Sequence, residues 1–407
     1  MMTTPGMARR AALPLCAGLL ALALAPHAPA TEAPNAYQQQ MARDQAEHPT
    51  LAIGAPAPDF ALPGTDGKVH RLADYAGSPV LAIVFISNHC PASQLYEGRI
   101  KALTADYAAK GVRLIAIAPN GPDAASPHEL NYTDVDDSPE AMKIRATWRK
   151  FNFDYLYDGE TQGVSHRYGP KVTPHIFIFD AQRRLRFEGR IDDNMKEARA
   201  QTHEARDAID ALLAGKPVAV SHTAVFGCST KWMTHAAAAK QEMAEWFKQP
   251  VKIEPVSGDG LRKLRANPTG KFLLVNFWAT WCAPCEREYP ALLQTYLWYR
   301  SRNFDFVSVS VDDPAQRADV QKFLEKYHSG IRNLHVDSDD VYKVMASFDK
   351  SWESGVPFTM LIAPDGSAVY QRAGEVDVLK LRRTILGRLS DAGFFAGNAQ
   401  YWLTEAK

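Results

Sequence analysis

One order of predicted elements occurs twice along this 407-residue chain, and it constrains the fold more than any other feature. Each copy has a strand, a helix, a second strand and a second helix, followed by a hairpin and a closing helix. The landmarks repeat as well, because a cysteine follows the first strand and a proline precedes the hairpin. The spacing from Cys90 to Pro174 is 84 residues, and that from Cys282 to Pro357 is 75. The sequence therefore predicts an α/β protein with two tandem domains, each a central mixed β-sheet flanked by helices.

The predicted elements of the first copy are strands at 80–87, 112–118 and 154–157, hairpin strands at 175–180 and 185–190, and helices at 91–110, 140–150 and 196–213. Those of the second copy are strands at 272–278 and 306–311, hairpin strands at 358–362 and 368–372, and helices at 284–302, 314–328 and 377–389. A connecting helix is expected at 231–248. The predicted organisation is a signal peptide at 1–30, a polar leader at 31–50, the first domain at 51–232, a linker helix within 233–252, the second domain at 253–390 and a tail at 391–407.

The first thirty residues have the order of a secretory signal. Arg9 and Arg10 precede an apolar stretch at 11–25, and Ala28-Pro29-Ala30 places small residues at the −3 and −1 positions. An uncleaved anchor is the alternative, but an apolar run of about 15 residues falls short of the ~20 that span a bilayer. We therefore expect cleavage after Ala30, loss of Cys16 with the signal, a periplasmic or secreted protein, and no stable membrane insertion after cleavage.

Composition narrows the partners and the chemistry. Lys and Arg total 46, and so do Asp and Glu, which gives no basic excess for nucleic acid. The twelve histidines show no metal-ligand spacing, and neither a metal nor a cofactor is expected. After signal cleavage, the remaining cysteines are Cys90, Cys228, Cys282 and Cys285. Four cysteines are too few to form a stabilising disulfide framework in a chain of this length, which indicates that they have a chemical role.

The most specific motif is Cys282-Ala283-Pro284-Cys285, placed directly after a strand at the start of a helix. The two sulfurs then lie one turn apart on one helix face. Because a helix N-terminus favours an anion, the Cys282 thiolate is the expected nucleophile and Cys285 the resolving thiol. A structural zinc site would need a second Cys or His pair, and the sequence has none.

This half resembles the thioredoxin fold and, within it, the TlpA-like family of exported thiol–disulfide oxidoreductases. The resemblance covers about residues 253–390 and rests on the run from Val275 to Cys282 and on Cys285-x-x-Glu288-x-Pro290. It implies a cis Val356–Pro357 bond against the disulfide and a role for Glu288 in proton transfer at the resolving cysteine. Asn276 stands where ordinary thioredoxins carry a buried Asp. The alternative for Glu288 is a solvated residue that only favours the helix dipole.

The first half keeps one cysteine of such a motif. Cys90 stands in Asn88-His89-Cys90-Pro91-Ala92-Ser93, so Ser93 occupies the partner position. A lone thiolate at a helix start can attack a disulfide or be oxidised by peroxide, and then needs a resolving thiol from elsewhere. Cys228 is the only cysteine left over. An inert Cys90 and a Cys228 that is merely a small buried hydrophobe are the alternatives. His89 either stabilises the thiolate or points away from it.

This half resembles a redoxin family placed with the AhpC/TSA peroxiredoxins, over about residues 50–232. The matching runs are Asn88 to Pro91, Asp137 to Met142, Gly189 to Asp193, Leu212 to Pro217 and Gly227-Cys228-Ser229-x-Lys231-Trp232. The resemblance implies that Cys90 and Cys228 belong to one functional unit. Pro174, which matches Pro357 in the repeated order of landmarks, is a further candidate site residue. Peroxiredoxins place Pro seven residues before the peroxidatic cysteine, where this chain has Ile83, while Ser87 fills their Thr or Ser position.

These features favour an exported disulfide reductase. Its substrates would be disulfide-bonded proteins, its reductant a membrane-bound periplasmic thiol protein, and one candidate target an internal Cys90–Cys228 disulfide. The first alternative is a thiol peroxidase in which Cys90 reduces hydroperoxide and the second domain recycles it. A second alternative is a non-catalytic scaffold for metal- or haem-protein maturation.

Overall fold

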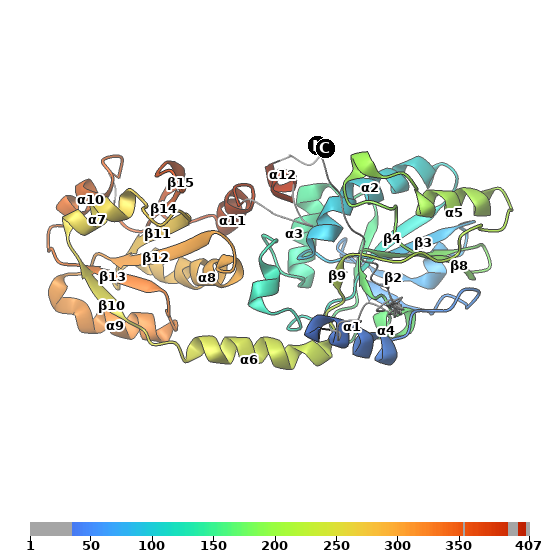
Figure 1. The fold of residues 1–407 in the computed structure, drawn as a ribbon, viewed down its shortest axis with the longest axis horizontal. Coiled ribbons are helices and arrows are strands. Elements are labelled where there is room, and N and C mark those ends of the chain that lie inside the picture. Colours follow the sequence, from blue (N-terminus) through green and yellow to red (C-terminus); the bar gives the residue numbers. More distant parts are fainter. Residues whose placement is uncertain (1–34, 353–354, 390–397, 404–407) are drawn as a thin grey trace, which may run out of the picture. The chain divides into compact units, whose positions relative to one another are not determined.

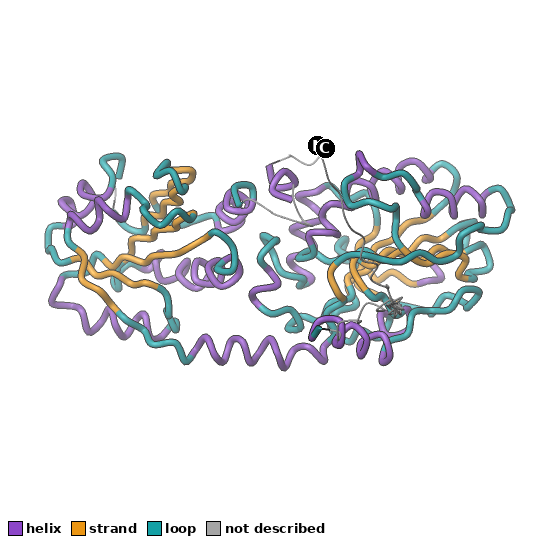
Figure 2. Tube along the Cα trace, in the orientation of Figure 1, coloured by secondary structure: helices purple, strands orange, loops and turns teal. Residues whose placement is uncertain are grey.

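The computed structural model describes residues 35–352, 355–389 and 398–403. The predicted signal peptide and its cut after Ala30 lie outside the described residues. Residues 41–407 form one compact unit that holds both repeats. Figure 2 shows the strands gathered into two sheets flanked by helices. The predicted fold class, two mixed sheets with covering helices, is thereby confirmed.

The first repeat has a five-stranded sheet with the order β5-β4-β3-β7-β8. The strands β3, β4 and β5 run parallel, whereas β7 pairs antiparallel with both β3 and β8. The strands are Leu81–Phe85 (β3), Arg113–Ala118 (β4), Asp154–Tyr157 (β5), His175–Phe179 (β7) and Leu185–Gly189 (β8). The helices are Pro91–Ala108 (α2), Pro139–Arg149 (α3), Ser165–Tyr168 (α4) and Glu204–Leu213 (α5).

The second repeat has the same strand arrangement with one more parallel strand at its edge, in the order β10-β13-β12-β11-β14-β15. The strands are Ile253–Val256 (β10), Phe272–Trp278 (β11), Phe304–Ser310 (β12), Arg332–Val336 (β13), Phe358–Ile362 (β14) and Ala368–Ala373 (β15). The helices are Gly258–Arg265 (α7), Ala283–Tyr299 (α8), Arg317–Lys326 (α9), Val341–Phe348 (α10) and Val378–Leu386 (α11).

Smaller elements complete the chain (Figure 1). The helices are Ala36–Glu47 (α1), Ala236–Phe247 (α6) and Asn398–Leu403 (α12), and the short strands are Ala61–Pro63 (β1), Val69–Arg71 (β2), Val172–Thr173 (β6) and Cys228–Ser229 (β9). Single 3-10 turns are Leu72–Tyr75, Pro127–Leu130, Glu197–Arg199, Met233–His235 and Pro314–Gln316. None of the helices in the described ranges is long and apolar enough to cross a membrane.

Strand alternation divides the core of each repeat into two layers. On β3, Ala82 and Val84 face the layer that α2 and α5 cover, whereas Leu81 and Ile83 face the layer closed by α4 and the β1–β2 hairpin. The second repeat follows the same rule, with α8 and α11 over one face and α7, α9 and α10 over the other. Because β3 and β11 are covered on both faces, they read as nearly continuous apolar runs.

The structure corrects several sequence predictions. The helix expected at 196–213 is a 3-10 turn followed by α5, which begins only at Glu204. Backbone groups before it are bound to Asp193, whose carboxylate accepts from Gln201 N–H and whose own N–H donates to the Thr202 carbonyl. These bonds compete with a helix for the same groups.

Other elements were not predicted. A helix, α1, lies within the expected polar leader, and α12 lies within the expected tail. The strand β10 contains Pro255, which a sheet tolerates at its edge, and β10 is an edge strand. The helices α7 and α10, of eight residues each, and the five-residue strand β13 are also absent from the sequence prediction.

Candidate functional site

Each repeat places its cysteine at the same point of the fold. Cys90 is the N-cap of α2 after β3, and Cys282 is the N-cap of α8 after β11. In both, the sulfur accepts a hydrogen bond from the backbone N–H three residues on, from Ser93 at 3.4 Å and from Cys285 at 3.2 Å. Backbone N–H groups at a helix start stabilise a thiolate. The cap geometry thus supports the expected activation at both positions.

The second repeat holds a closed disulfide between Cys282 and Cys285. Both cysteines are nearly buried, with 5% exposure at Cys282 and 1% at Cys285. The more accessible sulfur is therefore also the one at the helix cap. The neighbouring Trp281 is 66% exposed beside the disulfide and gives the site an apolar surface.

Hydrogen bonds hold both the loop that precedes the cysteine pair and the loop that contains Pro357. The buried carboxylate of Asp312, which follows β12, accepts hydrogen bonds from the backbone N–H and the hydroxyl of Thr280 at 3.1 and 2.6 Å. The Val356–Pro357 bond is cis, as the family resemblance implied. The Pro357 carbonyl accepts from Gly374 N–H at 2.8 Å, which holds the proline loop against β15.

A buried carboxylate lies behind the disulfide. Glu288 is 3% exposed, so it is not the solvated first-turn residue of the alternative interpretation. Its carboxylate accepts from the side-chain amide of Asn276 at 2.9 Å and from Val376 N–H at 2.8 Å. Burial raises the pKa of Glu288 to about 7, and the two hydrogen bonds only partly offset this rise. A carboxyl with a pKa near neutrality can exchange a proton with a thiol.

In the first repeat, the structure brings Cys90 to the other proline loop. Cys90 is fully buried, its thiol donates to the Thr173 carbonyl at 3.0 Å, and the following Thr173–Pro174 bond is cis. The Thr173 hydroxyl also bonds to that of Ser87 at 3.1 Å. Pro174 therefore occupies the place that Pro357 has in the second repeat.

Cys228 reaches the same loop on a different strand. The two-residue strand β9 pairs antiparallel with β6, and in this register Cys228 lies opposite Thr173. The approach is close enough to require Gly227, because a Cβ there would lie 2.1 Å from the Thr173 carbonyl oxygen. Two cysteines 138 positions apart in the sequence thus meet at one site.

The two thiols of this site have opposite acidity. Burial opposes ionisation of Cys90, but a hydrogen bond from Cys228, the charge of His89 and a hydrogen bond from the Thr173 hydroxyl together lower its pKa to about 5. The same hydrogen bond, burial and the negative charge of Cys90 raise the pKa of Cys228 well above its usual value. Cys90 is the thiolate of the pair and Cys228 the thiol.

His89 is positioned by a buried acid that the sequence did not identify. Its Nδ1 lies 2.5 Å from the carboxylate of Asp137, which also accepts from His89 N–H at 3.1 Å and from Asn120 at 2.8 Å. Burial lowers the pKa of His89, but the Asp137 charge and hydrogen bond raise it more. Asp137 belongs to a run that resembled the family pattern, which was the only signal available for it.

The two repeats carry different residues at the helix position of Glu288. Counted from the cap cysteine, the equivalent residue of α2 is Tyr96, whose hydroxyl donates to the Asp192 carboxylate at 2.7 Å. Arg99 also binds that carboxylate, at 2.6 Å. The first site therefore has no carboxyl group at this position of its helix, and the charge that favours its thiolate comes from His89.

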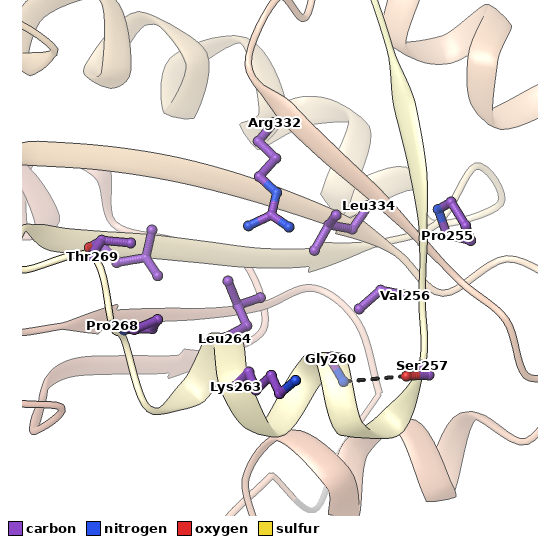
Figure 3. A pocket seen from close by; sticks show the side chains of 11 residues that line it. Pro255, Val256, Ser257, Gly260, Lys263, Leu264, Pro268, Thr269, Arg332 and Leu334 are labelled. Atoms are coloured by element: carbon purple, nitrogen blue, oxygen red, sulfur yellow. Dashed lines mark hydrogen bonds between the residues drawn. The ribbon is translucent and has the colours of Figure 1, made fainter.

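A pocket of about 280 Å³ lies apart from either cysteine pair (Figure 3). It is formed by β10, α7 and β13, with Lys263 and Arg332 among its lining, and holds none of the predicted site residues. Within the described ranges, no group of three or more His, Cys, Asp or Glu side chains is placed to hold a metal ion.

Comparisons with known proteins agree with this geometry. The AhpC/TSA family matches residues 53–188 and again 241–371. The thiol-disulfide oxidoreductase ResA of Bacillus subtilis (strain 168) is 34% identical over 133 residues, which are 32% of this chain and 69% of the relative. ResA of Bacillus anthracis is 30% identical over 106 residues, 26% of this chain and 57% of that protein.

Among solved structures, a hypothetical protein from Sinorhizobium meliloti 1021 is 32% identical, with a TM-score of 0.41, and the match covers 45% of this chain and 96% of that one. The two family matches together take in more than half of the chain. The chain therefore belongs to the AhpC/TSA family, as a thiol–disulfide oxidoreductase that contains two copies of the redoxin unit.

Proposed function

We propose that this protein is an exported disulfide reductase that acts on disulfide-bonded proteins. The Cys282 thiolate attacks one sulfur of the target disulfide, and the other target sulfur leaves as a thiolate. Cys285 then passes its proton toward Glu288 and attacks Cys282, which releases the target as a dithiol. The two electrons gained by the target come from the Cys282–Cys285 pair, which ends as a disulfide.

One observation carries this proposal. The Cys282–Cys285 disulfide lies at the start of α8, the Val356–Pro357 bond is cis, and a buried Glu288 whose pKa is about 7 lies on the same helix. The cap favours the attacking thiolate, and the carboxylate is a base matched to the resolving thiol. A membrane-bound periplasmic thiol protein would return the pair to its dithiol form.

The first repeat supplies an internal target. Cys90 and Cys228 meet beside cis-Pro174 and are within hydrogen-bond reach of each other, so a disulfide between them needs little rearrangement. Covalent attachment of the two repeats raises the effective concentration of one for the other. We infer that the second repeat reduces an oxidised Cys90–Cys228 pair.

Insulin reduction by the purified full chain tests the reductase activity. We expect turnover with dithiothreitol as the electron source, and its loss in Cys282→Ser. A Cys90→Ser/Cys228→Ser variant should retain the activity, because insulin reacts at the second repeat. An unchanged rate in Cys282→Ser would overturn the proposal.

Export is tested separately by cell fractionation and by the mass of the mature N-terminus. The proposal expects a periplasmic or secreted product that begins at Thr31. A product that keeps residues 1–30 in the cytoplasmic fraction would contradict it.

A peroxidase is the second candidate function. The observation that favours it is the fully buried Cys90 thiolate with a pKa of about 5, which a small hydroperoxide can reach more readily than a protein disulfide can. Attack on peroxide would give a sulfenic acid and water or an alcohol, and Cys228 would convert the sulfenic acid to a disulfide. Peroxide consumption that is lost in Cys90→Ser but kept in Trp281→Ala would favour this activity, and no consumption by the native chain would exclude it.

A further inference from the structure

We propose that Cys228, and not Cys90, is the sulfur that an incoming thiolate attacks when the first-repeat disulfide is reduced, and that Cys90 leaves. This inference rests on the proposed function, because it assigns the direction of exchange at the internal target. It also changes the interpretation from the sequence, where the helix-cap position pointed to Cys90 as the sulfur that meets other disulfides.

Access favours Cys228. Cys90 has no exposed surface and belongs to the apolar core cluster between the sheet and α2. Cys228 is only half-buried and lies on β9, a strand of two residues outside the main sheet. A thiolate must approach a disulfide in line with the sulfur–sulfur bond, on the side of the sulfur that it attacks. Cys90 has no exposed surface for such an approach, whereas Cys228 keeps some.

The stability of the leaving group favours the same direction. The Cys90 sulfur is the N-cap of α2, accepts from Ser93 N–H and lies beside the charge held by His89 and Asp137. These groups stabilise a thiolate on Cys90. A thiol with a low pKa leaves faster in exchange, whereas Cys228 has a raised pKa and leaves slowly.

The second repeat shows why this division is specific to the first. There the cap cysteine, Cys282, is also the more exposed of the pair, so the activated sulfur and the accessible sulfur are one atom. In the first repeat, activation and accessibility belong to different cysteines. Ser93 stands at the position of the local partner, and the second thiol, Cys228, lies on β9. The buried cap cysteine keeps the charge, and the partly buried Cys228 receives the attack.

The exchange balances without a further reactant. The Cys282 thiolate forms a bond to Cys228 as the Cys228–Cys90 bond breaks, and Cys90 takes the electron pair. Cys285 then attacks Cys282, and Cys228 leaves and takes up a proton, in keeping with its raised pKa. The products are a Cys282–Cys285 disulfide and a reduced first site.

Trapping in the full chain tests the proposal, with Cys16→Ser in every variant. Cys90→Ser/Cys285→Ser leaves only Cys228 and Cys282, and Cys228→Ser/Cys285→Ser leaves only Cys90 and Cys282. Each reduced variant is oxidised with diamide at low protein concentration, and the disulfide is identified by non-reducing peptide mapping. We expect the Cys282–Cys228 bond to form about tenfold or more faster than the Cys282–Cys90 bond.

The single variant Cys285→Ser provides a second measurement without a change in the first site. Oxidation of its three thiols should yield Cys282–Cys228 as the product that joins the repeats. A Cys282–Cys90 product of equal or greater yield would overturn the assignment of Cys228. It would still support reduction of the first repeat by the second. If neither product forms in any variant, the second repeat does not exchange disulfides with the first, and both the internal reduction and the assignment of Cys228 are wrong.

Discussion

At the scale of single residues, the two sites share a cysteine at a helix N-terminus but differ in the ionisable groups around it. Both cap a helix with a sulfur, but Glu288 supports the second site and the His89–Asp137 pair supports the first. The carboxyl of Glu288 is uncharged at low pH and can accept a proton only above its pKa. His89 carries a charge that acts on the thiolate and transfers no proton in the proposed exchange.

Glu288→Gln should slow insulin reduction by about 100-fold, because the amide cannot accept the proton of Cys285. In the native chain the rate should rise as the pH increases through about 7, where Glu288 becomes ionised. The variant should lose this rise. The mixed disulfide at Cys282 should accumulate in the variant and can be quantified by mass spectrometry, while an unchanged pH profile would contradict the role.

His89→Gln should raise the pKa of Cys90 by about one unit or more, because the positive charge that favours the thiolate is removed. The measurement is thiolate absorbance against pH in a Cys282→Ser/Cys285→Ser background, where Cys228 stays protonated. Asp137→Asn should shift the pKa of Cys90 in the same direction, since it removes the partner that keeps His89 charged. A thiolate titration identical to that of native protein would contradict this account.

At the scale of elements, the first site depends on a strand that is too short to be seen in the sequence. The pairing of β9 with β6 involves two residues on each strand, and it places Cys228 opposite Thr173. Gly227 permits this approach because it has no side chain and adopts a φ of +156°. In the second repeat both sulfurs belong to α8 and its cap, so no second strand is needed.

Gly227→Ala should displace β9 and weaken the Cys90–Cys228 contact, at a cost of about 1–3 kcal/mol in unfolding free energy. Diamide should then form the Cys90–Cys228 disulfide more slowly, as measured by loss of free thiols. Gly215→Ala is the matched control, because Gly215 also has a positive φ but a Cβ there meets nothing within 4 Å. Equal rates of disulfide formation in both variants would show that the close approach does not position Cys228.

At the scale of the whole chain, buried polar groups connect segments that are far apart in the sequence. Arg145 of α3 binds the Asp134 carboxylate at 2.7 Å and the Tyr401 hydroxyl of α12 at 2.8 Å. Tyr401 in turn donates to Glu97 at 2.7 Å, and Arg383 of α11 binds Asp134 at 2.7 Å. Buried charges of this kind are costly unless every partner is present.

Tyr401→Phe should lower the free energy of unfolding by about 1–3 kcal/mol. The substitution removes the hydroxyl that accepts from Arg145 and donates to Glu97, so each of these buried groups loses a hydrogen bond. Urea unfolding followed by fluorescence measures the change. Tyr342→Phe serves as the control, because Tyr342 is 76% exposed and should change stability little. A Tyr401→Phe variant as stable as the control would show that the network contributes nothing net.

The sequence by itself determined the duplicated α/β architecture, because strand and helix periodicity and the Cys-to-Pro landmarks are local patterns. It also identified Cys282, Cys285, Glu288 and Pro357 as site candidates, since these lie close together in a motif or beside a repeated landmark. In the structure Cys282 and Cys285 form a disulfide, Glu288 is buried on the same helix, and the Val356–Pro357 bond is cis.

Only the tertiary structure decided how the first site is assembled. Cys228, Asp137 and Thr173 are remote from Cys90 in the sequence, and no periodic pattern links them to it. Sheet register and loop packing bring them together. The resulting contacts stabilise a thiolate on Cys90 against the effect of its burial, and Cys228 remains the less buried of the two. The opposite acidity of Cys90 and Cys228 arises from these contacts, because hydrogen bonds and nearby charges shift a pKa only after folding has placed them.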